Sequence, residues 1–237
     1  MQGKIALEEH FAVTETQNPV APKSLQADLL DFEAKRLEEM DLFGIEFAVL
    51  SLNAPAVQEV LDVEGAVALA QQTNDMLAEQ VARHPSRFAG LGALPLQDPD
   101  AAITELHRCV NDLGFVGVNV NGFSQKEEEY SHLYYDLPEY RPFWAEVEKL
   151  GVPFYMHPRN PLTDHMPMYD GHPWLTYATW AFAMETSVHA LRLMCSGLFD
   201  EHPDLQLILG HLGERIPFDL WRLDHRLEVD PKGVPAK

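Results

Sequence analysis

The sequence has 237 residues, 46% of them hydrophobic, and 17 basic against 37 acidic side chains give a net charge of −20. This length fits one domain with a sizeable core. The negative charge argues against nucleic acid or an anionic membrane as a partner, because both repel such a surface. No signal-peptide pattern and no apolar run of roughly 20 residues is present, so we expect a cytoplasmic protein.

Six short apolar runs in the chain predict buried β-strands. They are too uniformly apolar for half-exposed strands and suit a parallel sheet that is covered on both faces. The runs occupy residues 4–11, 45–52, 87–96, 115–122, 152–158 and 205–213.

The segments between these runs predict helices, and strands that alternate with helices indicate an α/β fold with right-handed crossovers. Gly44 and Gly114 suit the residue that follows a helix, and Pro85 would end another. Cys109 and Cys195 fall inside expected helices and are interpreted as reduced thiols. The expected helices cover residues 31–44, 64–85, 99–114, 140–151 and 182–199, with one more around residue 222.

Two stretches break the alternation. Residues 12–30 are polar and contain proline without a clear period, and residues 159–181 are rich in Pro, Asp, His and Trp. Each follows a strand with ionisable side chains, and in a barrel the loops after strands gather on the catalytic face. We therefore expect a single domain over residues 1–237 with active-site insertions at these two places; decorative surface loops are the alternative.

Glu8 and His10 lie one residue apart at the end of the first run, so on an extended strand they point to the same side. A carboxylate oxygen and an imidazole nitrogen together suit a borderline divalent ion such as Zn²⁺ or Mn²⁺. Taken alone, the pattern also fits a buried pair that satisfies its own hydrogen bonds.

Two more strands end in histidine, at His157 and at His211. In a parallel barrel all strand ends of this kind lie on one face, so a shared site explains three imidazoles better than coincidence does. Glu214, three residues after His211, could orient that imidazole or support its protonated form. Arg222 could bind a carboxylate with its planar fork, although a surface ion pair is the alternative.

The other histidines are given structural interpretations. His189 lies four residues after Glu185 on an expected helix and is interpreted as a helix contact rather than a ligand. Four further histidines are expected at the exposed surface: His84, His107, His132 and His202. The sequence contains no G-x-S-x-G elbow, no glycine-rich phosphate loop and no C-x-x-C pair.

A run of motifs extends over residues 1 to about 228 and includes "GKIALEEHF", "SRFAGLGALPLQDP", "RCVNDLGFVGVNVNGFSQ", "VPFYMHPRNP", "YDGHPWL" and "GLFDEHPDLQLILGHLGE". Together these motifs resemble the non-oxidative aromatic acid decarboxylases of the amidohydrolase superfamily. The resemblance implies a metal-dependent (β/α)8 barrel and a homo-oligomer, usually a tetramer. The chain departs from the pattern, because it has six strand candidates and lacks the last two strands, one of which carries an aspartate metal ligand.

The resemblance also implies roles for individual residues. Glu8, His10 and His157 would bind one Mn²⁺ or Zn²⁺ ion, His211 would be the active-site histidine, and Glu214 would be its partner. Arg222 matches an arginine that binds the substrate carboxylate, sometimes across a subunit interface. Three residues would shape the aromatic pocket: Asn53, Ala54 and Phe182.

The reaction that the resemblance implies is the reversible decarboxylation of a hydroxybenzoate, such as 2,6-dihydroxybenzoate, to resorcinol and CO₂. It would need one divalent metal ion and no organic cofactor. Two alternatives stay open on the sequence alone. One is a metal-dependent amidohydrolase or lactonase, and the other is an inactive truncated barrel that acts only as an interaction partner.

Overall fold

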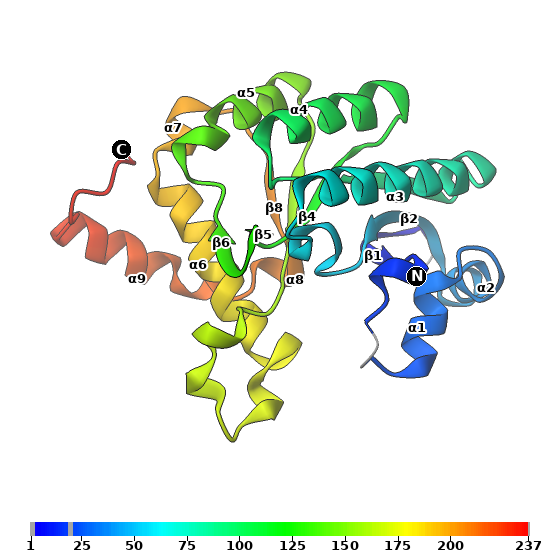
Figure 1. The fold of residues 1–237 in the computed structure, drawn as a ribbon, viewed down its shortest axis with the longest axis horizontal. Helices are drawn as coiled ribbons and strands as arrows, with labels where there is room; N and C mark the ends of the chain where they lie inside the picture. The colour runs from blue at the N-terminus through cyan, green and yellow to red at the C-terminus, as the bar shows by residue number, and fades with distance from the viewer. Residues whose placement is uncertain (1–2, 19–20, 237) are drawn as a thin grey trace.

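The computed structural model describes residues 3–18 and 21–236, so residues 19 and 20 of the expected 12–30 insertion lie outside it (Figure 1). Its centre is a six-stranded sheet in the order β1-β2-β3-β4-β7-β8, with every pairing parallel. The sheet forms a half-barrel, and each expected run contains one strand. The strands are β1 (Lys4–Phe11), β2 (Ile45–Leu52), β3 (Phe88–Ala93), β4 (Gly117–Asn121), β7 (Phe154–His157) and β8 (Leu207–Leu209).

Helices follow the strands at the expected places. Gly44 adopts the left-handed conformation, with a φ of 69°, directly after α2. The expected 99–114 helix divides into α4 and a π-helical turn, η3 (Arg108–Asp112). The helix expected over 182–199 breaks at Gly197, whose φ is 80°. Apart from α1, which is described below, the helices are α2 (Ala34–Phe43), α3 (Val63–Arg83), α4 (Pro99–His107), α5 (Arg141–Leu150), α6 (Ala181–Cys195), α7 (Leu198–Glu201), the single turn α8 (Gly210–Gly213) and α9 (Ile216–Val229).

Two apolar cores join the helices to one face of the sheet. In the first, α4, α5 and α6 pack against β4 and β7 around Trp144 and Phe154. In the second, α2 and α3 pack against β2 and β3 around Leu50 and Leu77. A smaller group on the opposite face, inside the half-barrel, includes Tyr155. Burying these side chains stabilises the fold by roughly 1.5–3 kcal/mol for each large apolar residue.

Three parts of the structure differ from the expectation. The 12–30 stretch contains a helix, α1 (Lys23–Leu30), which buries no side chain fully and therefore carries no strong apolar period. An antiparallel hairpin, β5 (Ser124–Lys126) and β6 (Glu128–Leu133), was not expected, because β6 is polar and largely accessible. The 159–181 segment contains four short 3-10 turns, η5 to η8, and forms the yellow-green lobe at the bottom of Figure 1.

Apolar side chains are exposed at the sheet edge and on the last helix. Ile5 and Leu7 of edge strand β1 are 63% and 57% exposed. Within residues 3–18 and 21–236, no further strand pairs with the outer edges of β1 or β8. Helix α9 projects from the body (Figure 1). Its Phe218 and Trp221 side chains are largely exposed. No helix in the described ranges combines the length and the apolar character needed to cross a membrane.

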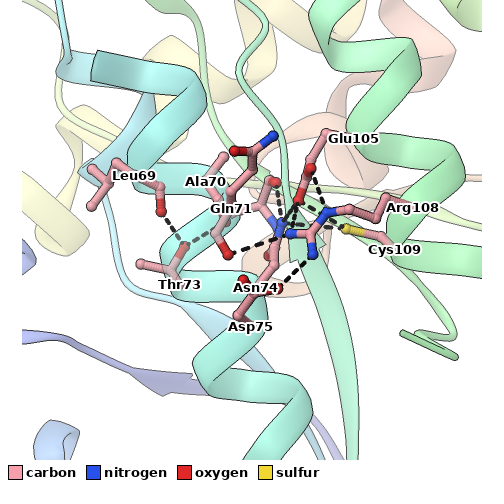
Figure 2. Close-up of polar contacts among 10 residues, drawn as sticks. Leu69, Ala70, Gln71, Thr73, Asn74, Asp75, Glu105, Arg108 and Cys109 are labelled. Carbon is pink, nitrogen blue, oxygen red and sulfur yellow. Dashed lines mark hydrogen bonds and ion pairs between the residues drawn. The ribbon is translucent and has the colours of Figure 1, made fainter. Parts of the chain in front are cut away.

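A buried polar network fixes the end of β3 to the helices beside it (Figure 2). The Asn74 amide on α3 donates to the Ala93 carbonyl at 2.9 Å and accepts from the Ala93 amide at 2.8 Å. The same amide donates to Glu105 at 2.6 Å, and the Arg108 guanidinium donates to both oxygens of that carboxylate, at 2.7 and 2.9 Å. Burial raises the pKa of the neighbouring Cys109 thiol, which therefore stays protonated.

We expect the substitution Asn74→Ala to lower the free energy of unfolding by about 2–4 kcal/mol, because it leaves both buried polar groups of Ala93 unpaired. The control is Asn111→Ala, an exposed amide on η3, which should change the free energy by less than about 0.5 kcal/mol. Urea denaturation of the two variants measures both values. Equal stability of the two variants would contradict the role of the network.

Candidate metal centre

The ends of β1, β7 and β8 bring four ionisable side chains together. Glu8 and His10 come from β1, His157 is the last residue of β7, and His211 lies two residues after the end of β8. The Glu8 Oε1 atom lies 3.2 Å from Nε2 of His211, 3.7 Å from Nε2 of His157 and 4.0 Å from Nε2 of His10. The His10 and His157 rings meet edge to face with centroids 4.4 Å apart. The structure thus gathers the carboxylate and the three imidazoles that the sequence pattern singles out.

Two of the histidines are held in the neutral form that can bind a metal. Burial lowers the pKa of His10, and burial lowers the pKa of His157 to about 3. The Nδ1 atom of His10 is 3.0 Å from the Ser51 hydroxyl. Its Nε2 atom is buried and has no hydrogen-bond partner among the described residues. A buried imidazole nitrogen without a partner is costly unless something binds it.

Hydrogen bonds hold the Glu8 carboxylate in its ionised form. Burial raises the pKa of Glu8, but hydrogen bonds from His211 and Tyr155 outweigh burial and keep it well below its usual range. The Tyr155 hydroxyl and the His211 backbone N–H, at 3.1 Å, both donate to Oε2. The Oε1 atom therefore faces the three imidazoles as an oriented negative ligand.

An unusual backbone turn places His211 beside Glu214. His211, Leu212 and Glu214 all have positive φ angles, of 49°, 58° and 50°. Such conformations are costly for residues other than glycine and cluster at functional sites. The turn brings Glu214 Oε1 to 2.9 Å from His211 Nδ1. The pKa of His211 is raised by its hydrogen bond to Glu8 and then by Glu214.

The donor set fits one divalent ion. Imidazole nitrogens and a carboxylate oxygen are the ligands of Zn²⁺ and related ions, with bonds of about 2.1 Å. Ligand atoms around such an ion lie roughly 3–4 Å apart. The distances from Glu8 Oε1 to the Nε2 atoms of the three histidines fall in this range. One set of ligand atoms within 4.8 Å of one another comes from Glu8, His157 and His211. The ligand set expected from the sequence has His10 in place of His211. The Nε2 atoms of both histidines lie within 4.0 Å of the Glu8 carboxylate.

The other expected site residues lie in different surroundings. The centroid of the Phe182 ring lies 5.9 Å from the centroid of the His211 ring, so Phe182 places an apolar surface beside His211. The Asn53 amide accepts from the Thr16 hydroxyl and donates to the Thr16 carbonyl, both at 2.9 Å, so it joins two loops. Ala54 follows it and is partly buried.

Arg222 stands apart from this group of side chains. It is exposed on α9, and it has no ion-pair partner within the part of the chain that the structure describes. The structure therefore does not bring Arg222 to the cluster within this chain.

Sequence reasoning missed two residues that orient the cluster. Tyr155 lies two positions before His157 on β7, and Ser51 pairs in register with His10 across β1 and β2. Since side chains two apart on a strand share a face, the alternation within the 152–158 run could have identified Tyr155.

The interpretation of His189 as a helix contact agrees with the structure. Its ring is buried, and Nε2 accepts the Tyr135 amide at 3.2 Å, whereas Glu185 accepts from Tyr134 at 2.6 Å. The expectation of four exposed histidines was wrong, because each packs against a neighbouring element and is half-buried: His84, His107, His132 and His202.

Comparison with known proteins identifies relatives over the whole chain. The family model described as "Amidohydrolase" matches residues 13–228. The gamma-resorcylate decarboxylase of Rhizobium sp. is 62% identical over 247 residues, an alignment that covers 100% of this chain and 75% of that protein.

Solved structures of decarboxylases also match the whole chain. A 2,6-dihydroxybenzoate decarboxylase in complex with 2,6-dihydroxybenzoate matches with a TM-score of 0.96 and 61% identity, covering 100% of this chain and 75% of the other. A dihydroxybenzoic acid decarboxylase from Polaromonas sp., with bound manganese and the inhibitor 2-nitroresorcinol, matches with a TM-score of 0.96 and 54% identity, covering 100% and 74%.

We expect the substitution Tyr155→Phe to weaken divalent-metal binding by about 10–100-fold, because the donor that orients Glu8 Oε2 is lost. Tyr130→Phe, at an exposed position on β6, is the matched control and should bind metal as the parent does. Competition with a chromophoric chelator gives the dissociation constants. Unchanged affinity in the Tyr155 variant would show that the hydroxyl does not orient the ligand.

Proposed function

The chain belongs to the amidohydrolase family, and on this basis we propose that its metal centre decarboxylates 2,6-dihydroxybenzoate without oxidation, giving resorcinol and CO₂. The chain is a carboxy-lyase of that family, related over its full length to proteins of this activity. The observation that carries the proposal is the convergence of Glu8 and three imidazoles at the strand ends.

The reaction sets a clear requirement for the site. Direct loss of CO₂ from a benzoate would leave an electron pair on the ring carbon as an aryl anion, which is very high in energy. If a proton is added to that carbon first, the C–C bond can break, its electrons return to the ring, and CO₂ leaves. An ortho hydroxyl supplies electron density for the protonation, and no electrons are exchanged with a redox partner.

Glu8, His10 and His157 would hold the divalent ion. An ion held there would supply Lewis-acid chemistry, with positive charge that lowers the pKa of the substrate's phenol and helps to fix its ring. Tyr155 and Ser51 keep Glu8 and His10 oriented for this role. The neutral forms of His10 and His157 follow from their burial.

His211 and Glu214 would stabilise charge and transfer protons beside the substrate ring. His211 lies between two carboxylates, those of Glu8 and Glu214, which together favour its protonated form. A protonated imidazole there stabilises negative charge that develops on the substrate oxygens. The nearby Phe182 ring supplies an apolar wall against which an aromatic substrate can stack.

Several expectations stay part of the proposal. Arg222 is exposed on α9, as an arginine that binds the carboxylate of a substrate in a neighbouring subunit would be. Asn53 and Ala54 would shape the pocket through the loop that Asn53 fixes. A homo-oligomer, a cytoplasmic location and a single domain over residues 1–237 complete the proposal.

We expect the purified chain with Mn²⁺ to convert 2,6-dihydroxybenzoate to an equal amount of resorcinol. Removal of metal with a chelator should abolish the reaction, and added Mn²⁺ should restore it, because the ion fixes the substrate. Liquid chromatography measures both compounds. A metal-loaded protein that leaves this substrate intact and hydrolyses lactones instead would contradict the proposal.

We expect His211→Asn to lower kcat by about 10²–10⁴-fold while the protein keeps its metal, because the variant loses an acid–base group beside the ring. His202→Asn is the matched control, since His202 also pairs with a carboxylate, that of Glu148 at 2.9 Å. The control should keep its activity. Loss of bound metal in the His211 variant would make His211 a ligand instead.

A further inference from the structure

A second group of potential metal ligands lies outside the Glu8 cluster. His132 on β6 meets Asp164 and His165 of the turn η5 (Thr163–His165). One nitrogen or oxygen atom from each residue lies within 4.8 Å of the other two. The three residues therefore join the β5–β6 hairpin to the 159–181 segment, and none of them belongs to the site of the proposed function.

The position of His132 is fixed by its neighbours. Its ring is nearly parallel to that of His165, at an angle of 11° and with centroids 4.2 Å apart. The Phe123 ring also contacts it, with centroids 4.7 Å apart, and the Arg159 guanidinium lies 4.2 Å from the centroid of that Phe123 ring. His132 is thus the anchored member of the group.

The free nitrogen of His132 is available to a ligand. Its Nε2 atom is buried, and no hydrogen-bond partner for it exists in the described part of the chain. Burial lowers the pKa of His132, so its imidazole is neutral and offers a lone pair. An imidazole nitrogen of this kind is costly unless a donor or an ion satisfies it.

The side chains of the other two residues, Asp164 and His165, are exposed and can change their rotamers. The side chains of Asp164 and His165 are 40% and 55% exposed, and Asp164 Oδ2 lies 3.8 Å from His165 Nε2. An ion bonded at about 2.1 Å needs lone pairs that converge, so the His165 ring must tilt out of its parallel stack with His132. A modest rotation of an exposed side chain provides this tilt.

We propose that His132, Asp164 and His165 form a second divalent-cation site, which takes Zn²⁺ or a similar borderline ion and links the hairpin to the 159–181 segment. Two imidazoles and one carboxylate make a three-ligand set that leaves a position for water. A bound ion ties the hairpin to this segment, which continues directly into α6 and Phe182. The site would thereby restrict a segment that ends beside His211.

The test counts ions per chain. Protein freed of metal is dialysed against Zn²⁺, and bound zinc is measured by mass spectrometry. We expect two ions in the parent chain and one in His165→Ala and in Asp164→Asn, because both side chains are exposed and can be changed without disturbing the core. His172→Ala is the matched control, because His172 is an exposed histidine of the same segment that packs on Trp174, and it should keep two ions.

A second pair of variants assigns the ions to their sites. His157→Ala should keep one ion, and adding His165→Ala to it should remove that ion. One zinc per parent chain, or two in His165→Ala, would overturn the proposal. Circular dichroism of each variant checks that the fold is kept, and the Asp164→Asn count decides the question if His165→Ala does not fold. Since these counts need no substrate, they do not depend on the decarboxylase activity.

Discussion

The carboxylate of Glu8 joins three strand ends that lie far apart in the sequence. One of its oxygens accepts hydrogen bonds from Tyr155 and from the His211 backbone, and the other faces three imidazole nitrogens. A partly buried negative charge of this kind must be compensated. Burial keeps His10 and His157 neutral, and protonated His211 offsets only one of the two carboxylates beside it, so a divalent cation is the further charge that this arrangement accommodates best.

The half-barrel brings the Glu8 carboxylate and the three imidazoles to the same end of the sheet. In a parallel sheet all strands end on the same side, so residues at the ends of β1, β7 and β8 meet without long loops. The helices on the other face hold the strands in register, and the Asn74 network fixes β3 to α3 and α4. The inner face is lined by apolar side chains near Tyr155, which carries the hydroxyl that orients Glu8.

The sequence predicted the framework well and the surroundings of the site less well. All six strands were predictable because buried parallel strands are uniformly apolar, and the three imidazoles were predictable because each ends such a run. Helix α1 and the β5–β6 hairpin were missed because few of their side chains are buried, which leaves no apolar period. The burial of His132 depends on packing with Phe123 and His165, and the sequence pattern around His132 does not predict these contacts.

The most direct test of the metal centre is the position of the ion in a crystal of this protein grown with Mn²⁺. Anomalous diffraction locates the ion without any assumption about its ligands. We predict a peak within bonding distance, roughly 2.1 Å, of Glu8 and of the Nε2 atoms of His10 and His157. Fully occupied manganese elsewhere, with Glu8 paired only to protein groups, would contradict the account.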